Sequence, residues 1–389
     1  MRKVWPFTLS FLLFAAMASV MPFVVLYYQG LDFTGAQIGL LTGIPPLITF
    51  FSAPLWTGFA DATGRHRLLM SLALLVGAIA LFVISGLYTF VPVLVTVVLL
   101  YIFVAPIMPL ADSATMFMLG DKKEMYGRIR LGGTIGYGLA ASIAGLLVQS
   151  HGLRWAFWGS AVLYVLGLLV SQKLVYGPSK AEAPAGERAR ALVANPRWLL
   201  FLVMAFAGGL GLAALNNYFY PYMKELGASE STMGLALTVG TISEIPILFF
   251  ANRLIRRLGA YRLLVLAMVI TGLRMVLFAA AGTPGLVLVL QLLNGLTFPA
   301  MWVAGVSYAD EHAPAGMRTT AQGLFNATAM GIGNAVGGFL GGPLLAGLGG
   351  RGLYLVFGVV VLVIVAIAAL LQRRLPAEQA VSAGAVRRG

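Results

Sequence analysis

Four charged residues lie deep within hydrophobic stretches of the chain, where a charge is costly. They are two acids and two bases: Asp112, Arg130, Glu244 and Arg274. An isolated charge at the centre of a bilayer costs at least about 2.5–3.5 kcal/mol, so such groups pair with one another or face a wet cavity. Intramembrane ionisable groups usually mark the pathway of a solute or an ion. We interpret these four as candidates for solute or proton binding, with structural ion pairs between helices as the alternative.

The composition indicates an integral membrane protein. Of the 389 residues, 60% are hydrophobic and 10% charged, whereas a soluble protein carries roughly a quarter charged residues. The chain has no cysteine, which excludes disulfides and thiolate chemistry. Its three histidines are too scattered for a zinc site, and we expect no metal or other cofactor. A membrane-embedded enzyme would need a cluster of catalytic side chains near one membrane interface. Residues 310–312 are the one weak candidate for such a cluster. We therefore expect a protein that is not an enzyme.

Twelve apolar runs of about 20 residues or more can each cross a hydrocarbon core roughly 30 Å thick. They must be helices, because lipid offers no partner for backbone N–H and C=O groups. The predicted fold class is therefore an all-α membrane protein with twelve transmembrane helices. The runs lie near residues 5–29, 36–59, 68–88, 91–119, 126–149, 153–174, 198–223, 231–254, 263–281, 284–309, 319–347 and 352–372.

The distribution of Lys and Arg predicts the orientation. With the N-terminus in the cytoplasm, 21 of the 26 basic residues lie on the cytoplasmic side and three on the opposite side. We expect a multi-pass protein of the plasma (inner) membrane with both termini in the cytoplasm. The same distribution accounts for the net charge of +13 without nucleic acid as a partner. The expected environment is the lipid bilayer, and the expected state is a monomer.

The spans divide into two related halves. At a constant offset of 195 residues, "LDFTGAQIGLL" (31–41) aligns with "LGASESTMGLA" (226–236), and "GRHRLLM" (64–70) with "GAYRLLV" (259–265). The polar stretch 176–197 has the composition of a linker. We therefore predict two pseudo-symmetric six-helix bundles. The expected parts are a bundle at 1–175, a cytoplasmic linker at 176–197, a second bundle at 198–372 and a cytoplasmic tail at 373–389.

The loop after the second span reads "GFADATGRHR" and matches the loop signature G-x-x-x-D-x-x-G-R-x-R/K of the major facilitator superfamily. Glycine at its first position lets helices approach closely, and the second glycine permits a tight turn. We expect the loop to stabilise one conformation of a transporter, with an ordinary basic loop as the alternative. The signature residues are Gly58, Asp61, Gly64, Arg65 and Arg67.

The fourth and fifth spans resemble the lactose permease and phenylpropionate permease branch of the same superfamily. The resemblance is carried by "PLAD" (109–112), by "YGRIRLGGTIGYGLAASIAG" (126–145) and by Arg274 after "SEIPILFFANRLIRRLGAYRLL" (243–264). It implies that Asp112 and Arg130 hold the substrate, and that Tyr137 stands where lactose permease stacks a tryptophan on its sugar. Asn294 and Thr297 occupy the positions of that permease's histidine and proton-carrying glutamate.

The resemblance implies a secondary transporter that works by alternating access. We predict import of a small organic solute, such as an aromatic acid, sugar or nucleoside, by proton symport. Substrate binding is expected at Asp112, Arg130, Tyr137, Arg274 and Asn294. At about 1.5 Å of rise per residue, Asp112 lies about 10 Å from the cytoplasmic end of its span, and Glu244 lies about 15 Å deep, near the midplane. Because Glu244 is nearer the midplane, it is the first candidate for the proton carrier, and Asp112 is the second. The alternative is a drug or metabolite efflux antiporter, although the fifth span lacks the proline that many of these carry.

Overall fold

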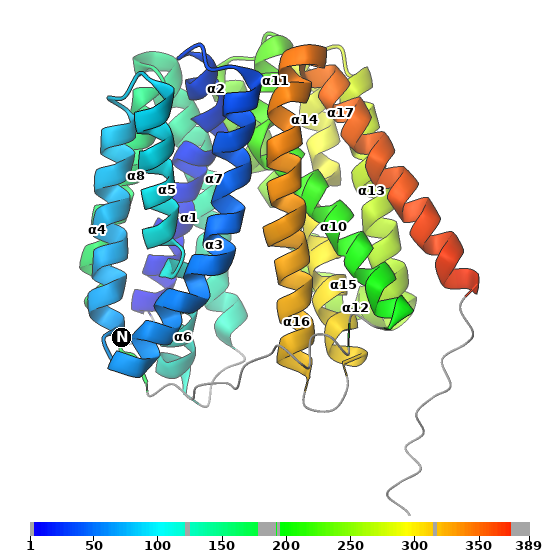
Figure 1. The fold of residues 1–389 in the computed structure, drawn as a ribbon, viewed down its shortest axis with the longest axis horizontal. Helices are drawn as coiled ribbons and strands as arrows, with labels where there is room; N and C mark the ends of the chain where they lie inside the picture. The colour runs from blue at the N-terminus through cyan, green and yellow to red at the C-terminus, as the bar shows by residue number, and fades with distance from the viewer. Residues whose placement is uncertain (1–3, 121–124, 178–191, 193–194, 314–316, 375–389) are drawn as a thin grey trace, which may run out of the picture.

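The computed structural model describes residues 4–120, 125–177, 192, 195–313 and 317–374, and the described elements are all helical. Figure 1 shows them as a bundle of roughly parallel and antiparallel helices. The elements are α1 (Val4–Val20), η1 (Met21–Phe23), α2 (Val24–Gln29), α3 (Gly35–Thr63), α4 (His66–Ile84), α5 (Phe90–Val104), α6 (Ile107–Leu119), α7 (Tyr126–His151), α8 (Arg154–Ser171), α10 (Pro196–Asn217), α11 (Phe219–Glu225), α12 (Glu230–Leu258), α13 (Ala260–Ala280), α14 (Pro284–Leu290), η3 (Gln291–Leu296), α15 (Phe298–Glu311), α16 (Arg318–Asn326), η4 (Ala327–Gly333) and α17 (Asn334–Arg374).

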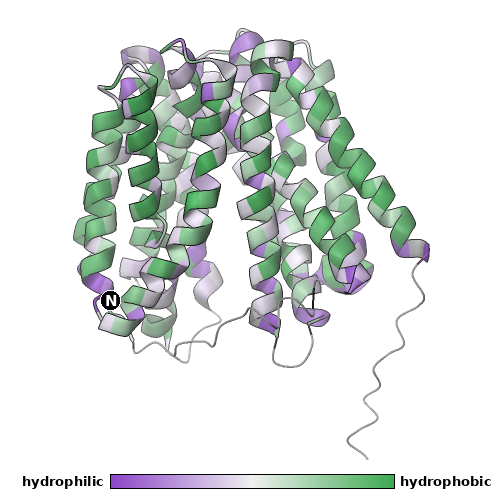
Figure 2. Ribbon diagram, in the orientation of Figure 1, coloured by the Kyte–Doolittle hydropathy of each residue, from purple (hydrophilic) through white to green (hydrophobic). Residues whose placement is uncertain are grey.

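Eleven helical stretches among the described residues are long and apolar enough to cross a membrane. The last of them, Thr320–Gln372, has 53 residues, which at 1.5 Å per residue is about 80 Å and more than twice the thickness of a bilayer core. It contains Gly349, whose φ of 67° and ψ of 178° are not helical. This glycine divides the stretch into two spans, so the predicted twelve-helix membrane fold is confirmed. In Figure 2, hydrophobic residues run along the helices and hydrophilic ones gather at their two ends.

The second and eighth spans show that the internal repeat extends to the helix caps. Helix α3 covers Gly35–Thr63 and helix α12 covers Glu230–Leu258, and both have 29 residues. Each begins after a hydroxyl N-cap, Thr34 or Ser229, whose side chain accepts a hydrogen bond from the backbone N–H three residues later. Each is followed by a glycine with positive φ, Gly64 at 67° and Gly259 at 79°, a conformation that glycine adopts without steric cost. Both helix boundaries keep the offset of 195 residues.

The helices before and after residues 178–191 form two groups in Figure 1, blue to cyan and green to red. We refer to them as the N-half and the C-half. The linker predicted at 176–197 and the tail predicted at 373–389 lie mostly outside the described residues, and the division into these parts stays a prediction. We call the side of the bundle where α1 begins the N-terminal side, and the opposite side the far side.

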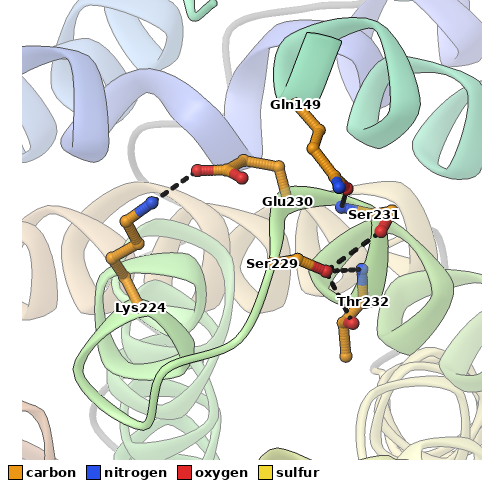
Figure 3. A network of polar contacts seen from close by, with 6 residues as sticks. All are labelled: Gln149, Lys224, Ser229, Glu230, Ser231 and Thr232. Carbon is orange, nitrogen blue, oxygen red and sulfur yellow. Dashed lines mark hydrogen bonds and ion pairs between the residues drawn. The ribbon is translucent and has the colours of Figure 1, made fainter.

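The two halves meet most closely on the far side, where α3 packs on α17 and α7 packs on α12. A Cβ atom on Gly145 would lie 2.5 Å from the carbonyl oxygen of Glu230, and one on Gly342 would lie 2.2 Å from that of Gly35. Figure 3 shows the polar contacts at this end, where the Ser231 N–H donates to Gln149 Oε1 of the other half at 3.2 Å.

Contacts of this kind become sparse toward the N-terminal side. A Cβ atom added to Gly58 of α3, Gly127 of α7 or Gly323 of α16 would meet nothing within 4 Å. On α7, for example, a Cβ atom on Gly145 would touch the backbone of the other half, whereas one on Gly127 at the opposite end would have nothing within 4 Å. The halves are in contact on the far side, and the two groups of helices diverge toward the N-terminal side in Figure 1.

Candidate functional site

A polar cluster lies midway along α12, α13 and the break between α14 and α15. Arg274 of α13 donates from Nη1 to Asn294 Oδ1 at 2.7 Å and to Thr297 Oγ1 at 3.1 Å, and from Nη2 to Gln291 Oε1. The side-chain amide of Asn294 donates in turn to Glu244 Oε1 of α12 at 2.8 Å. The structure thus brings together the predicted residues Glu244, Arg274 and Asn294, with Asn294 as the bridge between the acid and the base.

The local backbone explains why three side chains from one span reach the same guanidinium. Residues Gln291–Leu296 form a 3-10 helix, in which side chains three residues apart lie directly above one another. Gln291, Asn294 and Thr297 follow that spacing. Pro299 occupies the first turn of α15 and cannot donate a backbone hydrogen bond, so the helix breaks here.

Gln291 is the member of this cluster that the sequence analysis missed. It is 2% exposed and Thr297 is 1% exposed, although both lie in a span that crosses the membrane. The polar residues recur every third position before a proline, and this periodicity is the signal that could have identified Gln291.

Arg274 donates its hydrogen bonds to other side chains of the protein, whereas the Glu244 carboxylate has unused acceptor positions. The arginine is 2% exposed, its two terminal nitrogens donate to three neutral oxygens, and its guanidinium carbon lies 5.1 Å from the centre of the Phe278 ring. No ion pair between Arg274 and a carboxylate is found among the described residues. Glu244 is half-buried and accepts one hydrogen bond from Asn294. A carboxylate has about four acceptor positions, so Glu244 can bind a further donor or a proton.

Tyr137 approaches the cluster from the other half of the molecule. It lies on α7 next to Gly138, where an added Cβ atom would lie 3.6 Å from Thr241 Cγ2, three residues before Glu244 on α12. One turn further along, the Thr238 hydroxyl of α12 donates to the Gly138 carbonyl oxygen at 2.7 Å and lies 2.8 Å from Ser142 Oγ. These hydrogen bonds hold α7 against α12, so the Glu244 cluster lies at the boundary between the halves.

The second predicted pair lies in the N-half. Arg130 Nη1 of α7 is 3.8 Å from Asp112 Oδ1 of α6, and the two side chains are 41% and 42% exposed. The Tyr126 hydroxyl donates to the same carboxylate at 2.9 Å, and the guanidinium lies 4.6 Å from the centre of the Phe14 ring. The pair lines a small cavity that also contains Ser10 and Thr115. No contact between this pair and Arg274 or Glu244 occurs among the described residues, so the four charges form two separate groups.

The loop signature folds back on its own half. Asp61 Oδ1 lies 2.8 Å from His66 Nε2, and Arg67 donates to the Leu174 carbonyl oxygen at 3.0 Å. Gly64 ends α3 with the left-handed turn expected of it, and Arg65 is exposed. The expected close helix approach at Gly58 is absent in this conformation, because a Cβ atom added there would meet nothing within 4 Å. His66 was not among the candidate residues.

The described residues contain no group of three His, Cys, Asp or Glu side chains that could hold a metal ion. The polar groups at the two sites are carboxylates, guanidinium groups, amides and hydroxyls. They can bind a polar solute and exchange a proton.

Comparisons with known proteins identify the family of this chain. The sequence profile described as "MFS_1 like family" matches residues 7–371. Maltose permease of Geobacillus stearothermophilus is 30% identical over 368 residues, which cover 94% of this chain and 93% of that protein. Multidrug resistance protein MdtG of Escherichia coli is 28% identical over 375 residues, 90% of each protein. The crystal structure of the nucleoside transporter NupG superimposes with a TM-score of 0.84 at 20% identity, covering 96% of this chain and 99% of that one, and thus has the same fold.

Proposed function

The chain belongs to the MFS_1-like family of membrane transporters, and we propose that it imports a small neutral solute together with a proton. Solute and proton bind at the boundary between the halves, and the site is exposed alternately to the two sides of the membrane. The observation that carries this proposal is the half-buried Glu244 carboxylate, which accepts a hydrogen bond from Asn294 and has no direct ion pair with Arg274 among the described residues.

Proton coupling requires a group that takes up a proton on one side and releases it on the other. A carboxylate tied to a guanidinium by a short ion pair would stay charged. Asn294 separates Glu244 from Arg274. The positive charge of Arg274 therefore stabilises the charged form of Glu244 only in part, and Glu244 can still take up a proton. We propose that Glu244 carries the proton and that Asp112, which is partly exposed beside Arg130, is part of the solute site.

The hydrogen bonding favours a neutral solute over an aromatic acid. Arg274 is 2% exposed and donates to Asn294, Thr297 and Gln291, so its guanidinium presents no exposed edge to a carboxylate, although its buried Nε has no hydrogen-bond partner among the described residues. Arg130 is balanced by Asp112. Glu244 and Asp112 retain acceptor positions, which suit the hydroxyl groups of a sugar or nucleoside. Maltose permease among the relatives supports this class.

The experiment that tests the proposal is the substitution Glu244→Gln in purified protein reconstituted in proteoliposomes. Glutamine keeps the hydrogen-bonding shape but cannot ionise. We expect loss of solute accumulation driven by a pH gradient, with binding and solute exchange retained. The matched control is Glu230→Gln on the same helix, because Glu230 pairs with Lys224 on the far side at 2.5 Å and lies away from the boundary cluster. Undiminished pH-driven accumulation by the Glu244→Gln protein would contradict the proton role.

The alternative function is efflux of a drug or metabolite in exchange for protons. The 28% identity to a multidrug resistance protein favours it, and the same carboxylate would serve either direction. Growth with toxic compounds, compared between cells with and without the protein, separates the two: protection indicates efflux.

We further propose that the N-terminal side faces the cytoplasm and that the protein resides in the plasma membrane as a monomer. The bias of basic residues toward that side supports this orientation. With this assignment the conformation described above is open to the cytoplasm. The spacing of Asp112 and Arg130 and the position of Tyr137 support placement beside the lactose and phenylpropionate permeases.

A further inference from the structure

Three tyrosines lie within five residues at the junction of α10 and α11, and one of them has an unused hydroxyl. The Tyr218 hydroxyl donates to the Gly338 carbonyl oxygen at 2.6 Å, and the Tyr222 hydroxyl donates to that of Phe278 at 2.5 Å. The Tyr220 hydroxyl is buried and has no hydrogen-bond partner among the described residues. Buried polar groups without a partner are rare in native proteins, and each calls for an explanation.

The direction of the Tyr220 side chain separates it from its neighbours. Phe219 and Tyr222 pack against Phe278 of α13, with ring centres 5.8 Å and 5.9 Å apart, and so face the interior of the C-half. Tyr220 faces the other way. Its ring meets that of Phe23, in η1 of the N-half, at 4.7 Å and 80°.

This position connects Tyr220 to the boundary site. Tyr220 is 1% exposed, because the halves are closed on the far side. Phe23 follows α1, and α1 packs along α7, the helix that carries Tyr137 and packs on α12, which carries Glu244. Separation of the halves on the far side, which alternating access requires, would uncover a free hydroxyl at the entrance to the Glu244 site.

We propose that Tyr220 is a solute-binding residue whose hydroxyl forms a hydrogen bond with a hydroxyl group of the solute when the site is open to the far side. The inference rests on the proposed function, because it assumes that a neutral, hydroxyl-bearing solute passes this point. It adds a specificity-determining residue from the seventh span to a site otherwise built from α6, α7, α12, α13 and η3. Tyr220 would not increase the binding affinity of a solute analogue that lacks the contacted hydroxyl group.

The test compares Tyr220→Phe with Tyr222→Phe in the full chain, reconstituted in proteoliposomes, with radiolabelled maltose and uridine as the probes. The first substitution removes a hydroxyl that has no partner among the described residues, and the second removes one that donates to a backbone carbonyl oxygen. For the probe that the unaltered protein carries, we expect Tyr220→Phe to raise the half-saturation concentration about three- to tenfold, the loss of one hydrogen bond. Its melting temperature should be unchanged or higher, and pH-driven accumulation should persist.

The Tyr222→Phe protein should show the reverse pattern, with a lower melting temperature and an unchanged half-saturation concentration. A half-saturation concentration of Tyr220→Phe equal to that of the unaltered protein would overturn the inference. Failure of the unaltered protein to carry either probe would count against the proposed solute class, and the inference would fall with it. The role of Tyr220 is tested by the half-saturation concentration of the variant, and the solute class by uptake in the unaltered protein. A failure of one can therefore be distinguished from a failure of the other.

Discussion

At the scale of single residues, the two charged pairs differ in how the protein uses them. Arg274 is enclosed by amide and hydroxyl oxygens, so removing it would strand buried acceptors. Asp112 and Arg130 are each about two-fifths exposed and 3.8 Å apart. An exposed ion pair contributes only about 0–1 kcal/mol to stability. The second pair therefore has little structural value, and its presence inside a membrane span needs a functional reason.

This contrast leads to a prediction for the double substitution Asp112→Asn with Arg130→Gln. Replacing both partners leaves no unpaired charge, so we expect the protein to fold with a melting temperature within a few degrees of the original. Solute uptake should nevertheless be lost, because both binding groups are altered. Detergent melting curves and proteoliposome uptake measure the two effects. A double variant that folds and transports at the original rate would show that the pair does not bind the solute.

At the scale of helices, close backbone contacts between the two halves occur at glycine residues. Gly145 of α7 packs against the backbone of Glu230, whereas Gly159 of α8 has nothing within 4 Å of the position of a Cβ atom. Both glycines lie inside transmembrane helices and differ in their surroundings. They form a matched pair for testing the contact between α7 and α12.

We predict that Gly145→Ala favours the conformation that is open on the far side, because the new methyl group would lie 2.5 Å from a carbonyl oxygen of the other half. Gly159→Ala should have no such effect. The chain has no native cysteine, so Ser142→Cys can report on the contact through its rate of maleimide labelling. We expect faster labelling in the Gly145→Ala protein than in the Gly159→Ala protein. Equal rates would mean that α7 and α12 accommodate the methyl group without separating.

At the scale of the whole molecule, transport requires the halves to part on the far side and close on the N-terminal side. A covalent link across the far side should therefore stop turnover. Ser142 Oγ and Thr238 Oγ1 are 2.8 Å apart on opposite halves, which brings two cysteine sulfur atoms at these positions within bonding reach.

We predict that Ser142→Cys with Thr238→Cys is inactive after oxidation and regains transport on reduction. Each single variant should transport under both conditions, because neither can form the link. Uptake with and without dithiothreitol gives the measurement. Transport at full rate by the oxidised, cross-linked protein would contradict alternation of the two halves at this contact.

The sequence by itself determined the membrane class, the helices and the repeat. Long apolar runs permit one kind of structure in lipid, and a repeat at 195 residues dictates two similar bundles. The caps at Thr34 and Gly64 recur at Ser229 and Gly259 because helix ends depend on local residues. Such features need no knowledge of distant contacts, so they could be read from the chain.

The tertiary structure decided which polar groups meet. The sequence marked Glu244 and Arg274 as one acid and one base at similar depth, but it did not reveal that Asn294 stands between them or that Gln291 completes the cluster. These facts depend on the 3-10 turn before Pro299 and on the packing of α12 against η3. The sequence also did not reveal that the Tyr220 side chain faces the N-half, whereas the Tyr222 side chain faces the C-half. Directions of this kind are set by contacts between residues far apart in the chain, which local patterns do not encode.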